Sequence, residues 1–140
     1  MINPLLEHNT LPPFNDILPE HIVPAIETIL KELRFGIEEL LEIRPYSYES
    51  LVKARENLED KLHQAWSPVS HLNSVMNSVE LRDAHAVCLA MITDYYTEVG
   101  QNRPLFMAYQ SIASSAQYDS LPPARRKVID NALRDFRLSG

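Results

Sequence analysis

Two side chains with metal-binding or nucleophilic chemistry, His85 and Cys88, lie three residues apart in a stretch with helical spacing. Residues three apart share one face of a helix, so the pair could bind a metal ion together. Two ligands do not make a zinc site, however, and a nucleophilic Cys88 would need a partnering base and partial exposure. Because Cys88 falls on an apolar stripe, we expect a buried core cysteine beside a half-buried histidine.

The remaining histidines form no catalytic motif. The chain has five histidines, and none of them stands in an H-E-x-x-H sequence, the pattern that binds zinc in many peptidases. Asp60 and His63 match half of the pattern of a di-iron helical bundle, but the repeated Glu-x-x-His pairs are missing. Glu59 and His63 are more simply interpreted as a surface pair one helical turn apart. We therefore assign no catalytic, cofactor-binding or metal-binding residue in this chain.

Two further groups of residues could bind a partner or a ligand. A basic run near the C-terminus could bind an acidic partner or a phosphate, but Asp130 and Asp135 dilute its charge, which favours a solvated face. Aromatic residues at helical spacing could line a ligand slot, although such residues more often belong to the core. The basic residues are Arg125, Arg126, Lys127, Arg134 and Arg137, and the aromatic residues are Trp66, Tyr95, Tyr96, Phe106 and Tyr109.

The composition is that of an acidic globular protein and excludes several classes. The chain has 140 residues and a formal net charge of −6, which indicates one domain and argues against nucleic-acid binding. The three glycines, Gly36, Gly100 and Gly140, are too far apart to form a glycine-rich phosphate loop or a dinucleotide-binding motif. The single cysteine permits no internal disulfide, no apolar run could span a membrane, and the N-terminus lacks the pattern of a signal peptide. We therefore expect a cytoplasmic protein.

The elements that must position these residues are helices. Apolar residues recur at three- and four-residue spacing in five segments, about 19–43, 48–67, 79–100, 104–114 and 122–137, and no stretch alternates as a strand would. Ser47, Ser78 and Ser120 are the expected N-caps of the second, third and fifth helices. The prediction is an all-α fold, an antiparallel bundle of three long and two shorter helices over residues 19–140. An extended N-terminal arm at 1–18 precedes it, because prolines interrupt any helix there.

Prolines and a glycine set the expected helix ends. Pro24 is tolerable only in a first turn, so the first helix is expected to begin near His21. Pro68 is expected to follow the end of the second helix, and Gly100 is expected to end the third in a left-handed conformation. The polar string "WSPVSHLNSVMNS" at 66–78 is then interpreted as a connector between helices. Its polar residues Ser67, Ser70, Asn73 and Ser78 would satisfy free backbone groups at the helix ends.

Three separate strings of the chain resemble one protein family. They are "LPPFNDILPEHIVPAIE" at 11–27, "WSPVSHLNSVMNSVELRDAH" at 66–85 and "KVIDNALRDFRLSG" at 127–140. In order and spacing they are similar to the N-terminal region of the thimet oligopeptidase family of zinc metallopeptidases. The resemblance implies that the chain corresponds to roughly the first fifth of a longer peptidase, with no family catalytic residue among its own.

The same resemblance implies a function for the whole protein. Members of the family hydrolyse short peptides in a deep channel, with one zinc ion in a catalytic domain that this chain lacks. The chain alone would then be inactive, with that catalytic domain as its partner, and residues Ser67 to Ser78, through His71 and Asn73, could face the channel. Apolar residues on the first or last helix could also pair two copies as a homodimer. The alternative is a stand-alone helical module that binds another protein along an apolar groove.

Overall fold

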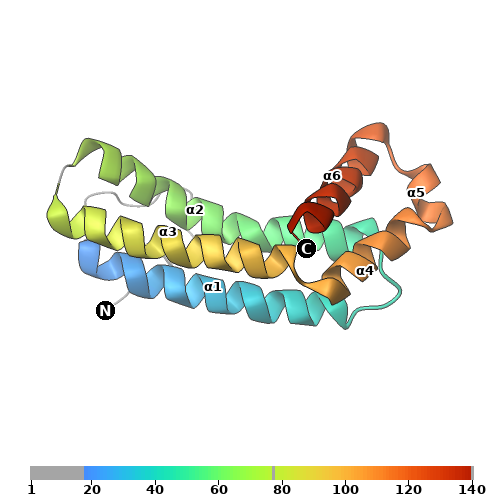
Figure 1. Cartoon of the computed structure of the whole chain (residues 1–140), viewed down its shortest axis with the longest axis horizontal. Helices are drawn as coiled ribbons and strands as arrows, with labels where there is room; N and C mark the ends of the chain where they lie inside the picture. Colours follow the sequence, from blue (N-terminus) through green and yellow to red (C-terminus); the bar gives the residue numbers. More distant parts are fainter. Residues whose placement is uncertain (1–17, 77, 140) are drawn as a thin grey trace. The chain divides into compact units, whose positions relative to one another are not determined.

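The structure, a computed structural model, describes residues 18–76 and 78–139 (Figure 1). The described residues form helices and contain no strand, so the predicted all-α fold is confirmed. The predicted N-terminal arm at 1–18 lies outside the described residues, except for Leu18. The elements are α1 (Pro19–Leu41), the π-helical turn η3 (Tyr48–Lys53), α2 (Ala54–Val75), α3 (Val79–Gly100), α4 (Arg103–Ala113), α5 (Ala116–Ser120) and α6 (Pro123–Ser139).

The described residues divide into two compact units. The first unit consists of residues 18–34, 58–76 and 78–94, and its core is almost wholly aliphatic. Each of its three helices buries residues three or four apart, as the apolar spacing predicted. The buried residues include Ile22, Ala25, Ile26, Ile29, Leu30 and Leu33 from α1, Leu62, Ala65, Pro68, Val69 and Leu72 from α2, and Leu81, Ala84, Cys88 and Ile92 from α3.

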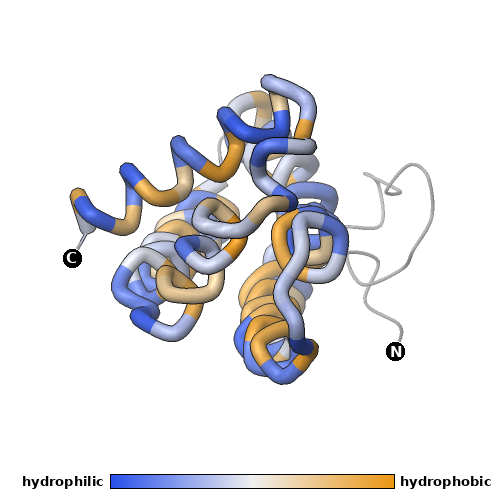
Figure 2. Tube along the Cα trace, turned by 90° about the vertical axis from the view of Figure 1, so that its right-hand side faces the viewer, coloured by the Kyte–Doolittle hydropathy of each residue, from blue (hydrophilic) through white to orange (hydrophobic). Residues whose placement is uncertain are grey.

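The second unit consists of residues 35–57 and 95–139, and aromatic rings fill much of its core. Phe136 of α6 packs against Phe106 and Tyr109 of α4, with 5.6 Å between ring centroids in both pairs. Figure 2 shows apolar and polar residues alternating turn by turn along α6, up to the C-terminus. The apolar stripe expected on the last helix is thus real. Ile129, Leu133 and Phe136 are buried within the chain itself, and only Val128 and Leu138 of the predicted apolar residues on this helix are exposed, so most of the stripe cannot pair two copies.

Polar side chains determine where several helices begin. Ser47 caps η3 as predicted, and its Oγ accepts a hydrogen bond from the N–H of Ser50 at 3.0 Å. Ser78 caps α3 as predicted, accepting from the N–H of Leu81 at 3.1 Å. Asn102 caps α4 in the same way, which the sequence analysis missed.

The predicted cap at Ser120 is wrong. The structure adds a short helix, α5, and Ser120 is its last residue. The last helix begins only at Pro123, where the carbonyl of Pro122 accepts the N–H groups of Arg125 and Arg126. The extra helix has a structural role, because Oε1 of Gln117 on α5 accepts a hydrogen bond from the N–H of Tyr48 at 2.7 Å.

Both prolines expected at helix boundaries lie inside helices. α1 begins at Pro19, so Pro24 stands in its second turn rather than its first. α2 continues through Pro68 to Val75, which contradicts the predicted end of the second helix. A proline within a helix costs about 3 kcal/mol. Continuing the helix buries Pro68, Val69 and Leu72, and this burial offsets the cost.

Gly100 is the last residue of α3 as predicted, but not in the predicted left-handed conformation. No glycine among the described residues has a positive φ, so the left-handed conformation is absent there. A methyl group at Gly100 would instead lie 2.7 Å from Oγ of Ser139 and 2.8 Å from its Cβ. The glycine therefore permits a close approach of the two chain segments.

Candidate functional site

The pair with the clearest chemistry, His85 and Cys88, is part of the first unit's core. Cys88 is fully buried, and burial raises the pKa of its thiol to about 11, with the Glu27 carboxylate adding to the effect. A thiol that stays protonated at neutral pH is neither a nucleophile nor a ready metal ligand. His85 is half-buried as expected, and its ring stacks on Trp66 with centroids 4.6 Å apart and planes 27° apart. The expected core cysteine beside a half-buried histidine is confirmed.

The part of the chain that the structure describes brings together no three His, Cys, Asp or Glu residues that could hold a metal ion. Asp60, which matched half of a di-iron pattern, accepts a hydrogen bond from Gln64 at 2.7 Å. His63 is exposed on the same helix. The pairing of His63 with Glu59 stays a prediction.

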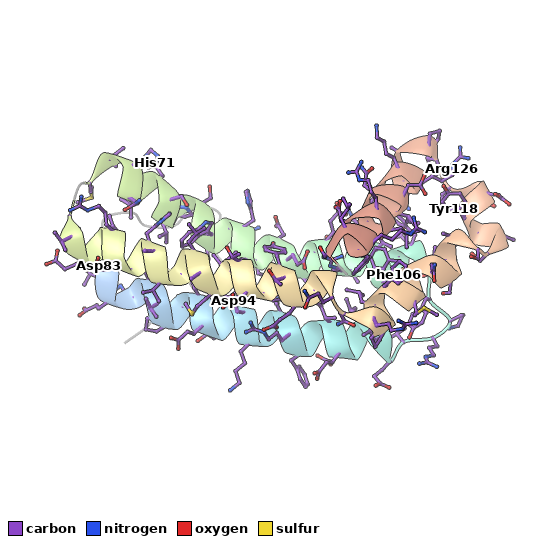
Figure 3. The ribbon with its side chains drawn as sticks, in the orientation of Figure 1. His71, Asp83, Asp94, Phe106, Tyr118 and Arg126 are labelled. Atoms are coloured by element: carbon purple, nitrogen blue, oxygen red, sulfur yellow. The ribbon has the colours of Figure 1, made fainter. Side chains whose placement is uncertain are left out.

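The polar string at 66–78 is helix for most of its length rather than a connector. Only Met76 to Ser78 separate α2 from α3. Of the four residues expected to cap helix ends, Ser78 does so. His71 is exposed near the C-terminal end of α2 (Figure 3). Asn73 is partly exposed, but its Oδ1 is buried and has no hydrogen-bond partner among the described residues.

Part of the basic run near the C-terminus forms contacts within the second unit. Arg125 forms an ion pair with Glu49 at 2.6 Å, and its guanidinium lies 4.7 Å from the centre of the Tyr48 ring. Arg126 is half-buried, and its Nε has no partner among the described residues. Arg125 is therefore a contact within the chain rather than a free cation that awaits a phosphate.

The aromatic residues do not form one ligand slot. Tyr95 and Tyr109 are buried in the second unit, and Phe106 and Tyr109 pack on Phe136. Arg55 donates a hydrogen bond to the hydroxyl of Tyr109 at 3.2 Å. The expectation that aromatic residues at helical spacing belong to the core is confirmed for Tyr95 and Tyr109 but not for Tyr96, which is 45% exposed.

One surface of the first unit was missed by the sequence analysis. Between Asp83 and Asp94, which Figure 3 labels on α3, ten successive residues include no Asp, Glu, Lys or Arg. Several of them are exposed on the side of α3 opposite to Cys88 and Ile92. We call this surface the α3 outer face; its residues are Ala86, Val87, Leu89, Ala90 and Thr93. The uncharged run could have been found in the sequence.

The other two helices of the first unit present charged surfaces. The exposed residues of α1 in this unit include Glu20, Glu27, Lys31, Glu32 and Arg34, and those of α2 include Asp60, Lys61, His63 and Gln64. The α3 outer face is therefore the candidate interaction surface. No helix in the described ranges is long and apolar enough to cross a bilayer.

Comparison with known proteins identifies relatives over the whole chain. Residues 26–140 match the family model described as "Neurolysin/Thimet oligopeptidase, N-terminal domain". The chain is 46% identical over 140 residues to oligopeptidase A of Haemophilus influenzae and 45% identical over 141 residues to oligopeptidase A of Escherichia coli. It is 29% identical over 138 residues to the organellar oligopeptidase A of Arabidopsis thaliana.

These matches cover all or nearly all of this chain but little of each relative. The alignments include 100% of the chain for both bacterial proteins and 99% for the plant protein. They include 21% of each bacterial relative and 17% of the plant relative. The chain thus spans about a fifth of the length of the bacterial relatives.

Proposed function

The chain belongs to the neurolysin/thimet oligopeptidase family, and we propose on this basis that it is the N-terminal helical part of an oligopeptidase that hydrolyses short peptides. The observation that carries the proposal is the 46% identity to an oligopeptidase A over the full length of the chain. Since that relative is almost five times longer, the groups that break the peptide bond are proposed to lie in the remainder of the protein. By the remainder we mean the part of the peptidase that these 140 residues do not include.

The proposed zinc ion belongs to that remainder as well. The described residues of this chain do not fit a zinc site, because the Cys88 thiol is buried with a raised pKa and His85 is stacked on Trp66. The role proposed for this chain is to cover the catalytic part and one side of the channel. The exposure of His71 near the end of α2 supports a contact of this segment with the remainder or the channel, whereas Oδ1 of Asn73 is already covered by this chain.

Two coarser features of the proposal concern organisation and location. We place residues 19–140 in one helical domain of the longer protein, and the protein itself in the cytoplasm. The lone, buried cysteine suits a reducing compartment.

A peptide-cleavage assay tests the proposed function. The complete protein encoded by the gene and the 140-residue chain are purified, and each is assayed with a quenched fluorescent peptide, with and without EDTA. We expect the complete protein to cleave the peptide, to lose activity with EDTA and to contain zinc by elemental analysis. Cleavage by the 140-residue chain alone, or a tightly held zinc ion in it, would contradict the proposal.

A second candidate function is a stand-alone helical interaction module. The burial of Leu133 and Phe136 within the chain's own second unit favours it, because the last helix then needs no further domain to cover it. A gene whose coding sequence stops at Gly140 would favour this candidate over the peptidase.

A further inference from the structure

The α3 outer face combines exposure with an absence of charge. Val87 and Leu89 are 50% and 48% exposed, and Ala86, Ala90 and Thr93 are exposed as well. These residues add nothing to the core of the first unit, since α3 buries its opposite side there. Over residues 84–93, α3 therefore has no charged residue on any side, which is typical of a buried segment rather than a surface one.

The charges on the neighbouring helices show which surface of this unit another segment could cover at a low cost in free energy. Covering the outer faces of α1 and α2 would take Lys31, Glu32 or Lys61 out of water, and buried charges without partners are strongly destabilising. Covering Val87, Leu89 and the two alanines has no such cost and gains apolar burial. Of the three helices of this unit, α3 is therefore the one suited to a permanent contact.

The size of the face distinguishes between a second copy and a tethered partner. From Ala86 to Thr93 the face is about 11 Å long, and a helix is about 10 Å wide, so it offers roughly 100 Å². A stable complex between separate proteins buries about 1,200–2,000 Å² in total. Two copies that met through this face alone would bury roughly a sixth of the lower value. A domain in the same polypeptide can use a small face because its effective concentration is high.

From these observations we infer that the α3 outer face is the surface on which the remainder of the same peptidase polypeptide packs. The inference rests on the proposed function, since it requires that the remainder exists. Ala86 and Ala90, four residues apart, have short side chains that let an apposed helix or loop come close. The contact holds the N-terminal helices against the catalytic part through α3, leaving the charged faces of α1 and α2 in water.

Cysteine labelling tests the inference without relying on activity. Ala90→Cys is introduced into the complete protein and into the 140-residue chain, and the rate of reaction with a maleimide is measured. The native Cys88 gives little background because it is fully buried and its thiol pKa is about 11. We expect Ala90→Cys to react at least about tenfold more slowly in the complete protein than in the 140-residue chain. That ratio corresponds to a thiol that is uncovered less than about a tenth of the time. A second variant, Ala86→Cys, should behave alike.

The matched control is Lys31→Cys, because the Lys31 side chain is exposed on the charged face of α1. It should react at the same rate in both proteins. Equal rates for Ala90→Cys in both proteins would overturn the inference. A slowing of Lys31→Cys in the complete protein as large as that of Ala90→Cys would also overturn it. Activity of the complete protein together with an unprotected Ala90→Cys would reject the docking face but keep the proposed function.

The same labelling experiment distinguishes two other occupants of the face, a second copy of the chain and its own residues 1–17. A labelling rate of the 140-residue chain that falls over a roughly hundredfold rise in its concentration would assign the face to a second copy. Slow labelling of that chain at every concentration would assign the face to its own residues 1–17. Either result would overturn the inference.

Discussion

The two compact units are built by different means. The first unit packs aliphatic side chains from three helices, and its aromatic contact is the Trp66–His85 stack. The second unit joins residues far apart in sequence through polar groups, such as Tyr48 with Gln117 and Arg125 with Glu49, around an aromatic cluster. Exposed ion pairs contribute little to stability, whereas buried aromatic rings contribute several kcal/mol. We therefore expect both units to depend on apolar burial, with the polar contacts of the second unit determining how its elements are arranged.

The largest expected effect is the loss of the aromatic cluster in the second unit. Phe136→Ala should lower the free energy of unfolding by about 3–5 kcal/mol, because the ring is buried and a cavity remains. Urea denaturation measures the effect. The control is Leu138→Ala on the same helix, where the side chain is 79% exposed, and the change should stay within about 0.5 kcal/mol. Equal effects of the two variants would show that α6 is not packed as described.

Alkaline pH should reveal a buried thiol in the first unit. The folded protein holds the Cys88 proton more tightly than the unfolded chain, because its pKa is raised from 9.0 to about 11. The stabilising contribution is present in full below about pH 9 and is lost as the pH rises towards 11, with a magnitude of roughly 2 kcal/mol.

The comparison with Cys88→Ala isolates this contribution. Other groups, including Tyr48 and Tyr118, also have raised pKa values, and they remain in both proteins. Urea denaturation between pH 8 and about pH 11 should therefore show a shallower loss of stability for the variant. Parallel curves for the two proteins would mean that the thiol is not held protonated by burial.

A smaller effect is expected at the beginning of η3 in the second unit. Ser47→Ala removes the acceptor for the N–H of Ser50 and one half of a reciprocal capping arrangement. The loss should be about 1 kcal/mol, measured by urea denaturation. Ser67→Ala, at an exposed helical position of the first unit, serves as the control and should change stability by less than about 0.5 kcal/mol. A neutral Ser47→Ala would show that the cap is dispensable.

The smallest expected effect concerns the Arg125–Glu49 ion pair, a kind of contact that distinguishes the second unit from the first. Glu49→Gln should cost about 0.2–1 kcal/mol, because both side chains of the Arg125–Glu49 pair are substantially exposed. Salt at about 1 M should remove most of the difference between the variant and the natural protein. A double-mutant cycle with Arg125→Gln gives the coupling energy directly. A salt-independent loss above about 2 kcal/mol would contradict the view that this contact arranges the unit rather than stabilising it.

Local sequence patterns were sufficient to predict most of the helices and their buried sides. The spacing of Ile22, Ile26, Ile29 and Leu33 predicted the buried side of α1, and all four are buried. Ser47 and Ser78 predicted helix starts because a hydroxyl one residue before a helix accepts an N–H within the next turn. The burial of Cys88, and hence its lack of chemistry, also followed from its place on an apolar stripe. These features depend on residues within one or two turns of each other.

Only the tertiary structure determined the features that depend on distant residues. The helix continues through Pro68 because the positions after it are buried against other helices, which outweighs the lost backbone hydrogen bond. Gly100 is required by the approach of Ser139, almost forty residues later, rather than by its own backbone conformation. The uncharged run from Ala84 to Thr93 is visible in the sequence, but only the packing of α3 separates its buried side from the side that remains exposed. Local preferences are set within the chain segment, whereas burial is a property of what surrounds it.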